Sequence, residues 1–77
     1  MSLSDSIKLI RQKKLLNQQE FADILEVGLT TVNRWEVGKS IPNLSAMKKI
    51  KAYCENNGIA YDIVESEWLS ARLEAKK

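Results

Sequence analysis

The stretch that most constrains this fold is residues 18–37, QQEFADILEVGLTTVNRWEV, whose pattern predicts two short helices joined by a tight turn. Apolar or small residues recur there at helical spacing, with one interruption at the turn between the two helices. They are Phe21, Ala22, Leu25, Val27, Val32 and Trp35. Ala22 is small, and a large side chain there would hold the crossing helix away. We therefore expect a helical chain organised around this pair.

Capping residues indicate the ends of both helices independently of the periodicity. Asn17 can cap the first helix, and Glu20 at its third position completes a capping box. Gly28 can cap the second helix, which we expect to span residues 29–37 before Gly38 ends it. The caps and the periodicity thus predict the same two helices.

The segments NQQEFADILEV and TTVNRWEVGKSIP resemble the Cro and phage-repressor type of helix-turn-helix DNA-binding domain, also called the xenobiotic-response-element type. With Ile10-Arg11 upstream and Pro42-Asn43-Leu44 downstream, the resemblance covers roughly residues 3–54. It implies an all-α fold, a compact bundle of about five helices like the lambda-repressor DNA-binding domain. It also implies that Arg11 and Glu36 form a structural ion pair.

Two residues depart from the pattern of this family. Relatives usually have glycine in the turn where this chain has Glu26, and a left-handed conformation there would cost about 1 kcal/mol for the Cβ atom. Leu29 stands where relatives often place a polar residue at the start of the second helix. One expected hydrogen-bonding contact to a base is therefore missing.

Helical signals continue on both sides of the pair. A first helix is expected from Ser2 or Ser4 to about Lys14, and Asn43 can cap a later helix that Gly58 stops. The apolar positions that these two helices should bury are Leu3, Ile7, Ile10, Met47, Ile50 and Cys54. We expect residues 1–58 to form the helix-turn-helix domain.

Residues 59–77 lie outside the resemblance and predict a C-terminal helix that closes the core. Val64 and Trp68 are expected inside that core. The remaining apolar surface of this helix predicts a homodimer, with Leu69 and Leu73 at the contact. The alternative is that the same surface binds a different partner protein.

The composition excludes several classes of protein. Seventy-seven residues hold one domain, near the lower size limit for folding without disulfides or metals. A single cysteine, Cys54, and the lack of histidine leave no internal disulfide, no zinc-ligand cluster and no Cys-His or Ser-His nucleophile. We therefore expect no metal, no cofactor and no enzyme, in the reducing cytoplasm. No apolar run approaches the roughly 20 residues of a membrane span, so no membrane partner is expected.

The second helix of the pair is the element predicted to read DNA, because the major groove, about 12 Å wide, admits a helix. The side chains within about 140° of arc on its predicted outer face are Leu29, Thr30, Asn33 and Arg34. Arg34 can bind guanine, Asn33 can bind adenine, and Thr30 or Leu29 can contact a thymine methyl group. The residues expected to contact phosphates are Gln18, Thr31, Lys39 and Asn43. For Gln18 this role is implied by the resemblance.

These features predict a sequence-specific transcriptional regulator that binds double-stranded DNA, in this family most often a repressor, acting as a homodimer on paired half-sites. The alternative is an antitoxin-like regulator or a protein-interaction module whose C-terminal helix binds a partner protein. An enzyme is the least supported class, because the sequence offers no constellation of acid, base and nucleophile.

Overall fold

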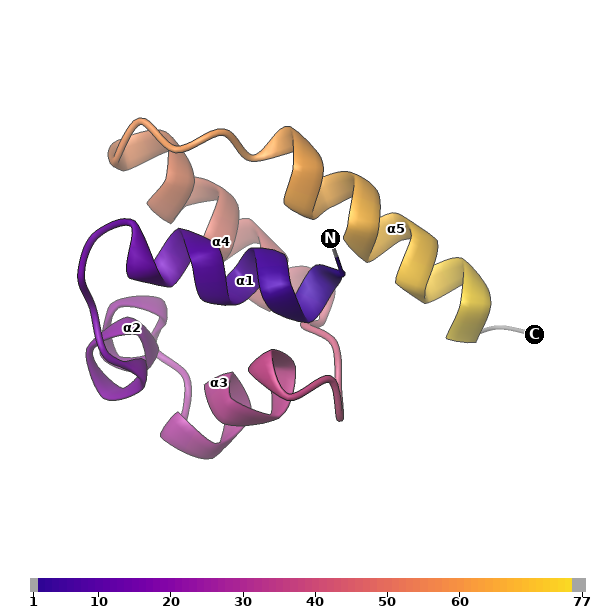
Figure 1. Cartoon of the computed structure of the whole chain (residues 1–77), viewed down its shortest axis with the longest axis horizontal. Helices are drawn as coiled ribbons and strands as arrows, with labels where there is room; N and C mark the ends of the chain where they lie inside the picture. Colours follow the sequence, from indigo (N-terminus) through magenta and orange to yellow (C-terminus); the bar gives the residue numbers. More distant parts are fainter. Residues whose placement is uncertain (1, 76–77) are drawn as a thin grey trace.

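The computed structural model describes residues 2–75, and the prediction of an all-α chain is confirmed for them. The helices of this range are α1 (Leu3–Gln12), α2 (Gln18–Leu25), α3 (Leu29–Glu36), α4 (Leu44–Asn56) and α5 (Asp62–Ala75). Figure 1 shows α2 and α3 below α1, and α5 above it and extending to its right. Helix α2 packs on α3 and α4, while α1 packs on α3 and α5.

Side chains cap the N-termini of α1, α2 and α4 as the sequence predicts. Ser2 Oγ accepts a hydrogen bond from the Asp5 N–H at 3.3 Å, so Ser2 and not Ser4 caps α1. At α2, Asn17 Oδ1 accepts from the Glu20 N–H at 2.8 Å, and Glu20 Oε1 accepts from the Asn17 N–H at 2.9 Å. Asn43 caps α4 in the same way. These bonds satisfy backbone donors that the first turn of a helix leaves unpaired.

Helices α1 to α4 end in one shared backbone motif, in which two N–H groups beyond the helix bond back to carbonyls of the last turn. At the end of α2, Val27 N–H donates to the Ala22 carbonyl at 3.0 Å and Glu26 N–H to the Asp23 carbonyl at 3.2 Å. The motif places one residue at positive φ in each case: Leu15 (57°), Glu26 (60°), Gly38 (81°) and Gly58 (65°). Two of these four turns therefore hold a side chain in a conformation that favours glycine.

Two predicted helix ends are wrong by one or two residues. Helix α1 ends at Gln12 and not at Lys14, because the chain already turns at Leu15. Helix α3 ends at Glu36, and Val37 is its C-cap, whereas the prediction ran to residue 37. The left-handed conformation that the family pattern raised as a possibility for Glu26 is present, while that of Leu15 was not foreseen.

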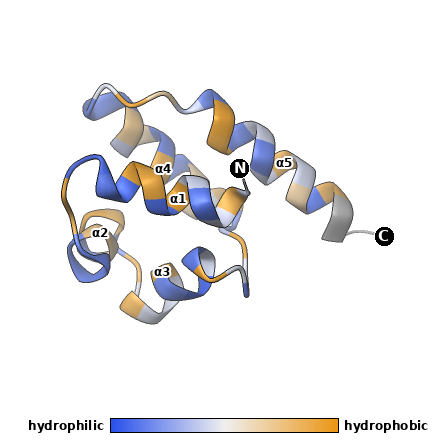
Figure 2. Ribbon diagram, viewed as in Figure 1, coloured by the Kyte–Doolittle hydropathy of each residue, from blue (hydrophilic) through white to orange (hydrophobic). Residues whose placement is uncertain are grey.

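The five helices enclose one apolar core. Figure 2 shows hydrophobic and hydrophilic residues alternating along the helices, as amphipathic helices require. Every position predicted to be apolar and buried in α1 to α4 is so, including Ala22 and Cys54, which are fully buried. Tyr53 adds to this core: its ring meets Phe21 edge-on at 5.2 Å, and its hydroxyl donates to the Ile10 carbonyl at 3.0 Å. A buried tyrosine hydroxyl needs such a partner, which sequence alone does not reveal.

One side of helix α5 closes the core, while its other side is exposed. Val64 and Trp68 are buried as predicted, and the Trp68 indole N–H donates to the Pro42 carbonyl at 2.6 Å. On its outer side Ile63, Leu69 and Leu73 are exposed by 63%, 51% and 69%. The C-terminal turns of α5 extend past the rest of the bundle in Figure 1.

Candidate nucleic-acid interface

Helix α3 lies at the surface with one face packed and the opposite face free. Val32 and Trp35 are buried beneath it, and Gly28 caps its start in an extended conformation, without a side-chain bond. The fully buried Ala22 on α2 permits the close approach of the two helices. The packed side fixes the direction in which the other side points.

The side chains predicted to contact bases lie together on the free side of α3, which we call the outer face. These are Leu29, Thr30, Asn33 and Arg34, and all four are exposed. Leu29 is 44% exposed, so it offers an apolar contact at the first position of the helix. The outer face thus combines an aliphatic group, a hydroxyl, an amide and a guanidinium group on one rigid element.

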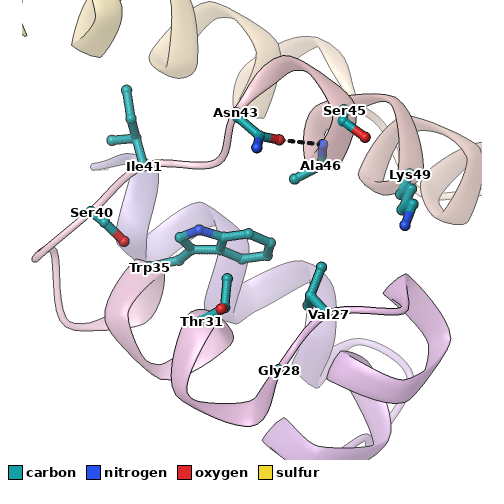
Figure 3. A pocket seen from close by; sticks show the side chains of 10 residues that line it. All are labelled: Val27, Gly28, Thr31, Trp35, Ser40, Ile41, Asn43, Ser45, Ala46 and Lys49. Atoms are coloured by element: carbon teal, nitrogen blue, oxygen red, sulfur yellow. Dashed lines mark hydrogen bonds between the residues drawn. The ribbon is translucent and has the colours of Figure 1, made fainter.

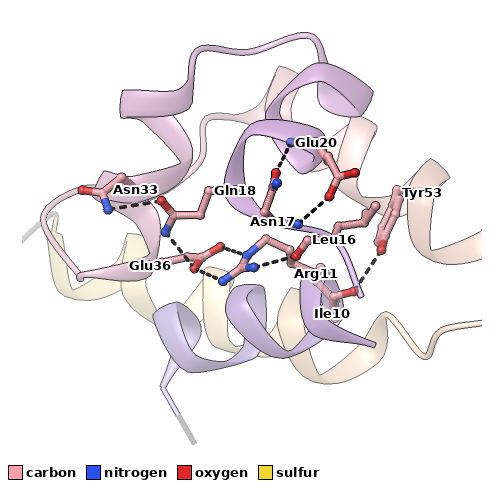
Figure 4. A network of polar contacts seen from close by, with 9 residues as sticks. All are labelled: Ile10, Arg11, Leu16, Asn17, Gln18, Glu20, Asn33, Glu36 and Tyr53. Atoms are coloured by element: carbon pink, nitrogen blue, oxygen red, sulfur yellow. Dashed lines mark hydrogen bonds and ion pairs between the residues drawn. The ribbon is translucent and has the colours of Figure 1, made fainter. Parts of the chain in front are cut away.

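A polar network connects this outer face to the interior (Figure 4). Arg11 donates to Glu36 through Nε at 2.7 Å and through Nη2 at 2.9 Å, and its Nη1 donates to the Leu16 carbonyl at 2.7 Å. Gln18 Nε2 also donates to Glu36, at 3.1 Å. Asn33 Nδ2 in turn donates to Gln18 Oε1 at 3.4 Å. The network therefore joins α1, α2 and α3.

The ion pair at the centre of this network is mostly removed from water. The side chains of Arg11 and Glu36 are 11% and 3% exposed. The hydrogen bonds with Glu36 raise the pKa of Arg11 above its ordinary value, and burial opposes this rise. A buried pair is tolerated only when the groups of both partners are satisfied, which here requires Gln18 and the Leu16 carbonyl as well.

A hollow of about 460 Å³ lies between α3 and the first turns of α4, with Trp35 along its floor (Figure 3). Its polar side chains are Thr31, Ser40, Asn43, Ser45 and Lys49. The Asn43 side-chain oxygen accepts from the Ala46 N–H at 2.8 Å, which leaves its amide nitrogen free to donate. Hydroxyl, amide and ammonium donors of this kind bind phosphate oxygens.

The structure brings together two of the four residues predicted to contact phosphates, Thr31 and Asn43, in this hollow. Gln18 lies apart from it in the polar network, and Lys39 is exposed just after α3. The sequence prediction did not include Ser40, Ser45 or Lys49. For Ser40 and Ser45 the available signal was their closeness in sequence to the Asn43 cap, whereas Lys49 lies farther along α4 and carried no such signal.

Other kinds of site find no support among the described residues. Residues 2–75 contain no group of acidic, cysteine or histidine side chains that could hold a metal ion. Burial raises the pKa of the Cys54 thiol to about 11, so it is not a reactive thiolate at neutral pH. In the same part of the chain, no helix is long and apolar enough to cross a membrane.

Comparison with known proteins agrees with this geometry. Residues 7–55 match the model of a family described as helix-turn-helix, a segment that contains α2, α3 and the whole polar network. The HTH-type transcriptional activator BcrR of Enterococcus faecalis is 32% identical over 53 residues. This alignment covers 69% of the present chain but 26% of BcrR, so the chain spans about a quarter of the length of that relative. No solved structure matches the chain.

Proposed function

The chain belongs to the helix-turn-helix family, and from this membership we propose that it is a cytoplasmic transcriptional regulator that binds a specific double-stranded DNA sequence. The observation that supports the proposal most strongly is the outer face of α3, where four exposed side chains project from a helix whose other side is buried. A helix held in this way fits the major groove, where all four base pairs can be distinguished.

The outer face provides contacts of different kinds. We propose that Arg34 donates to guanine O6 and N7, and that Asn33 pairs with adenine N6 and N7. Thr30 or Leu29 would contact a thymine methyl group. Each bidentate contact of this kind discriminates against the wrong base by about 1 to 3 kcal/mol.

The phosphate contacts would come from the edges of the same surface. Thr31 and Asn43 line the hollow between α3 and α4, where Lys49 adds a positive charge. Lys39 and Gln18 would hold the strand farther along, because each has a donor group beside α3. Such contacts set the position of the protein on the duplex without selecting a sequence.

We propose a homodimer formed through the exposed side of α5. Leu69 and Leu73 there are 51% and 69% exposed. Contact of these large aliphatic side chains with water is unfavourable, and burial at an interface would remove it. A two-fold dimer would place two α3 helices on half-sites one helical turn apart, about 34 Å. The same side chains also favour the second candidate function, binding of a different protein as in an antitoxin-like regulator.

The direction of regulation is proposed to be repression. A protein bound over a promoter blocks transcription by occupancy alone, whereas activation needs an additional productive contact with the transcription machinery. The relative BcrR is named an activator, so a helix-turn-helix segment of this kind also occurs in activators. A reporter gene behind the bound site separates the two, because occupancy should lower its expression.

The deciding experiment is selection of bound duplexes from a random-sequence library, followed by footprinting on the DNA that flanks the gene. We expect one enriched motif with two-fold symmetry, and affinity that falls steeply with salt. Lys39→Ala should lower the slope of log affinity against log salt by about 1, while Lys14→Ala, on the turn after α1, should not. A folded protein that binds no duplex at low salt would overturn the proposal.

A further inference from the structure

The polar network fixes which atoms of two side-chain amides face each other. The carboxylate of Glu36 only accepts hydrogen bonds, so the Gln18 atom at 3.1 Å from Glu36 Oε1 has to be the amide nitrogen. The carbonyl oxygen of Gln18 then faces Asn33, and the Asn33 atom at 3.4 Å from it has to be a donor, Nδ2. The remaining polar atom of Asn33, the Oδ1 oxygen, points away from Gln18 in Figure 4.

From this order of donors and acceptors we infer that Glu36, acting through Gln18, sets the orientation of the Asn33 amide and thereby the base that Asn33 accepts. This inference rests on the proposed function, because it concerns the same outer face of α3. It assigns Gln18 and Glu36 a role as positioning residues for base selection. That role is additional to phosphate contact for Gln18 and to the ion pair for Glu36.

The outward oxygen requires a base that carries a hydrogen-bond donor in the major groove. Adenine meets this requirement through N6, and its N7 can accept the second hydrogen of Asn33 Nδ2, which the bond to Gln18 leaves free. Guanine presents only the acceptors O6 and N7, so an outward Oδ1 would face an acceptor without a hydrogen between them. The network therefore favours adenine over guanine at the base that Asn33 contacts.

The strength of this bias follows from the distances. The bonds of Glu36 to Arg11, at 2.7 and 2.9 Å, are short and charged, and they hold the carboxylate in place. The bond from Asn33 to Gln18, at 3.4 Å, is longer than the usual range and is the weak step. The orientation is thus biased by at most about the factor of five that one ordinary hydrogen bond supports, so the flipped orientation of the Asn33 amide stays accessible.

The test compares base preference in two matched variants, Gln18→Leu and Gln19→Leu. Gln19 neighbours Gln18 on α2, but it donates to Asp23 at 2.9 Å and lies outside the network. The base pair read by Asn33 is first identified as the one whose preference disappears in Asn33→Ala. At that pair the adenine-over-guanine affinity ratio should fall, by up to about fivefold, in Gln18→Leu and stay unchanged in Gln19→Leu.

A double variant and a spectroscopic measurement separate positioning from phosphate contact. In the Asn33→Ala background, Gln18→Leu should lower affinity for all sequences alike without further change in base preference. In the free protein, the NMR signals of the Asn33 side-chain amide should shift in Gln18→Leu but not in Gln19→Leu. Should Gln18→Leu fail to fold by circular dichroism, Gln18→Ala serves in its place, since alanine suits the first turn of a helix.

Two results would overturn the inference and leave the proposed function intact. The first is a uniform loss of affinity in Gln18→Leu, with the adenine-to-guanine ratio unchanged. The second is a wild-type preference for guanine or thymine at the base that Asn33 contacts. Failure of the wild-type protein to bind any duplex is different, because it would remove the proposed function itself.

Discussion

Replacing Glu26 with glycine should stabilise the fold, although it removes a side chain that takes part in an ion pair. Glu26 ends α2 with φ 60° and ψ 41°, in the left-handed region. There the Cβ atom of an L-residue approaches the following carbonyl oxygen, at a cost of about 1 to 2 kcal/mol. Glycine has no Cβ atom and adopts the same conformation freely.

Two effects oppose this gain. Glycine gives the unfolded chain more conformational freedom, which costs about 0.4 to 1 kcal/mol of stability. The Glu26–Lys49 pair is lost, but its atoms are 3.8 Å apart and the side chains are 79% and 40% exposed, so it contributes a few tenths of a kcal/mol at most. The middle values of these ranges leave a net gain of about 0.5 kcal/mol, or roughly 2 to 4 °C in melting temperature for a domain of this size.

Urea titrations followed by circular dichroism measure the change in the free energy of unfolding. Leu15→Gly is a matched variant, since Leu15 has φ 57°, is 92% exposed and ends α1 in the same motif without the ion pair. Ala52→Gly, on the exposed side of α4, reports the cost of glycine without relief of strain and should lose about 1 kcal/mol. If Glu26→Gly lost as much as Ala52→Gly, the strain argument would be refuted.

Three further outcomes are expected. Arg11→Ala should cost about 3 to 5 kcal/mol in thermal unfolding, because it leaves Glu36 buried and charged, whereas Lys49→Ala should change stability by less than about 0.5 kcal/mol. Burial raises the pKa of Cys54 from its ordinary 9.0 to about 11, so the contribution of this thiol to stability should be constant below pH 9 and fall as the pH rises towards 11. In urea titrations, Cys54→Ala should remove part of that fall, and an undiminished fall would contradict the assignment. Truncation after Trp68 should abolish dimers in sedimentation, and dimers that persist would exclude the end of α5 from the interface.

The helices and the core could be predicted from the sequence because their signals are local. Asn17 and Glu20 form a capping box three residues apart, and apolar spacing alone identifies the inward face that holds Val32 and Trp35. The same face defines its opposite, so the exposure of Asn33 and Arg34 follows without further information. How those residues contact DNA stays a prediction.

The features that were missed depend on contacts between distant residues or on strained turns. Leu15 carries no turn signal, although the backbone bonds around its left-handed conformation are local, from the Leu15 N–H to the Gln12 carbonyl and from the Leu16 N–H to the Arg11 carbonyl. The bond from Asn33 to Gln18 joins residues fifteen positions apart and depends on how α2 and α3 cross. Side-chain periodicity gives the faces of two helices but not their offset along each other, so such a contact is not readable from spacing.

With the proposed role of Asn33, the polar network would link stability and base selection in one set of bonds. Burial of Arg11 and Glu36 is tolerable because the Leu16 carbonyl and the Gln18 amide satisfy the groups that the pair itself leaves free. Those bonds continue to Asn33 on the outer face of α3. A substitution at Glu36 should therefore alter both the free energy of unfolding and the base preferred at Asn33. Arg34 lies outside this set of bonds, so its proposed contact with DNA should be open to change by substitution while the fold keeps its stability.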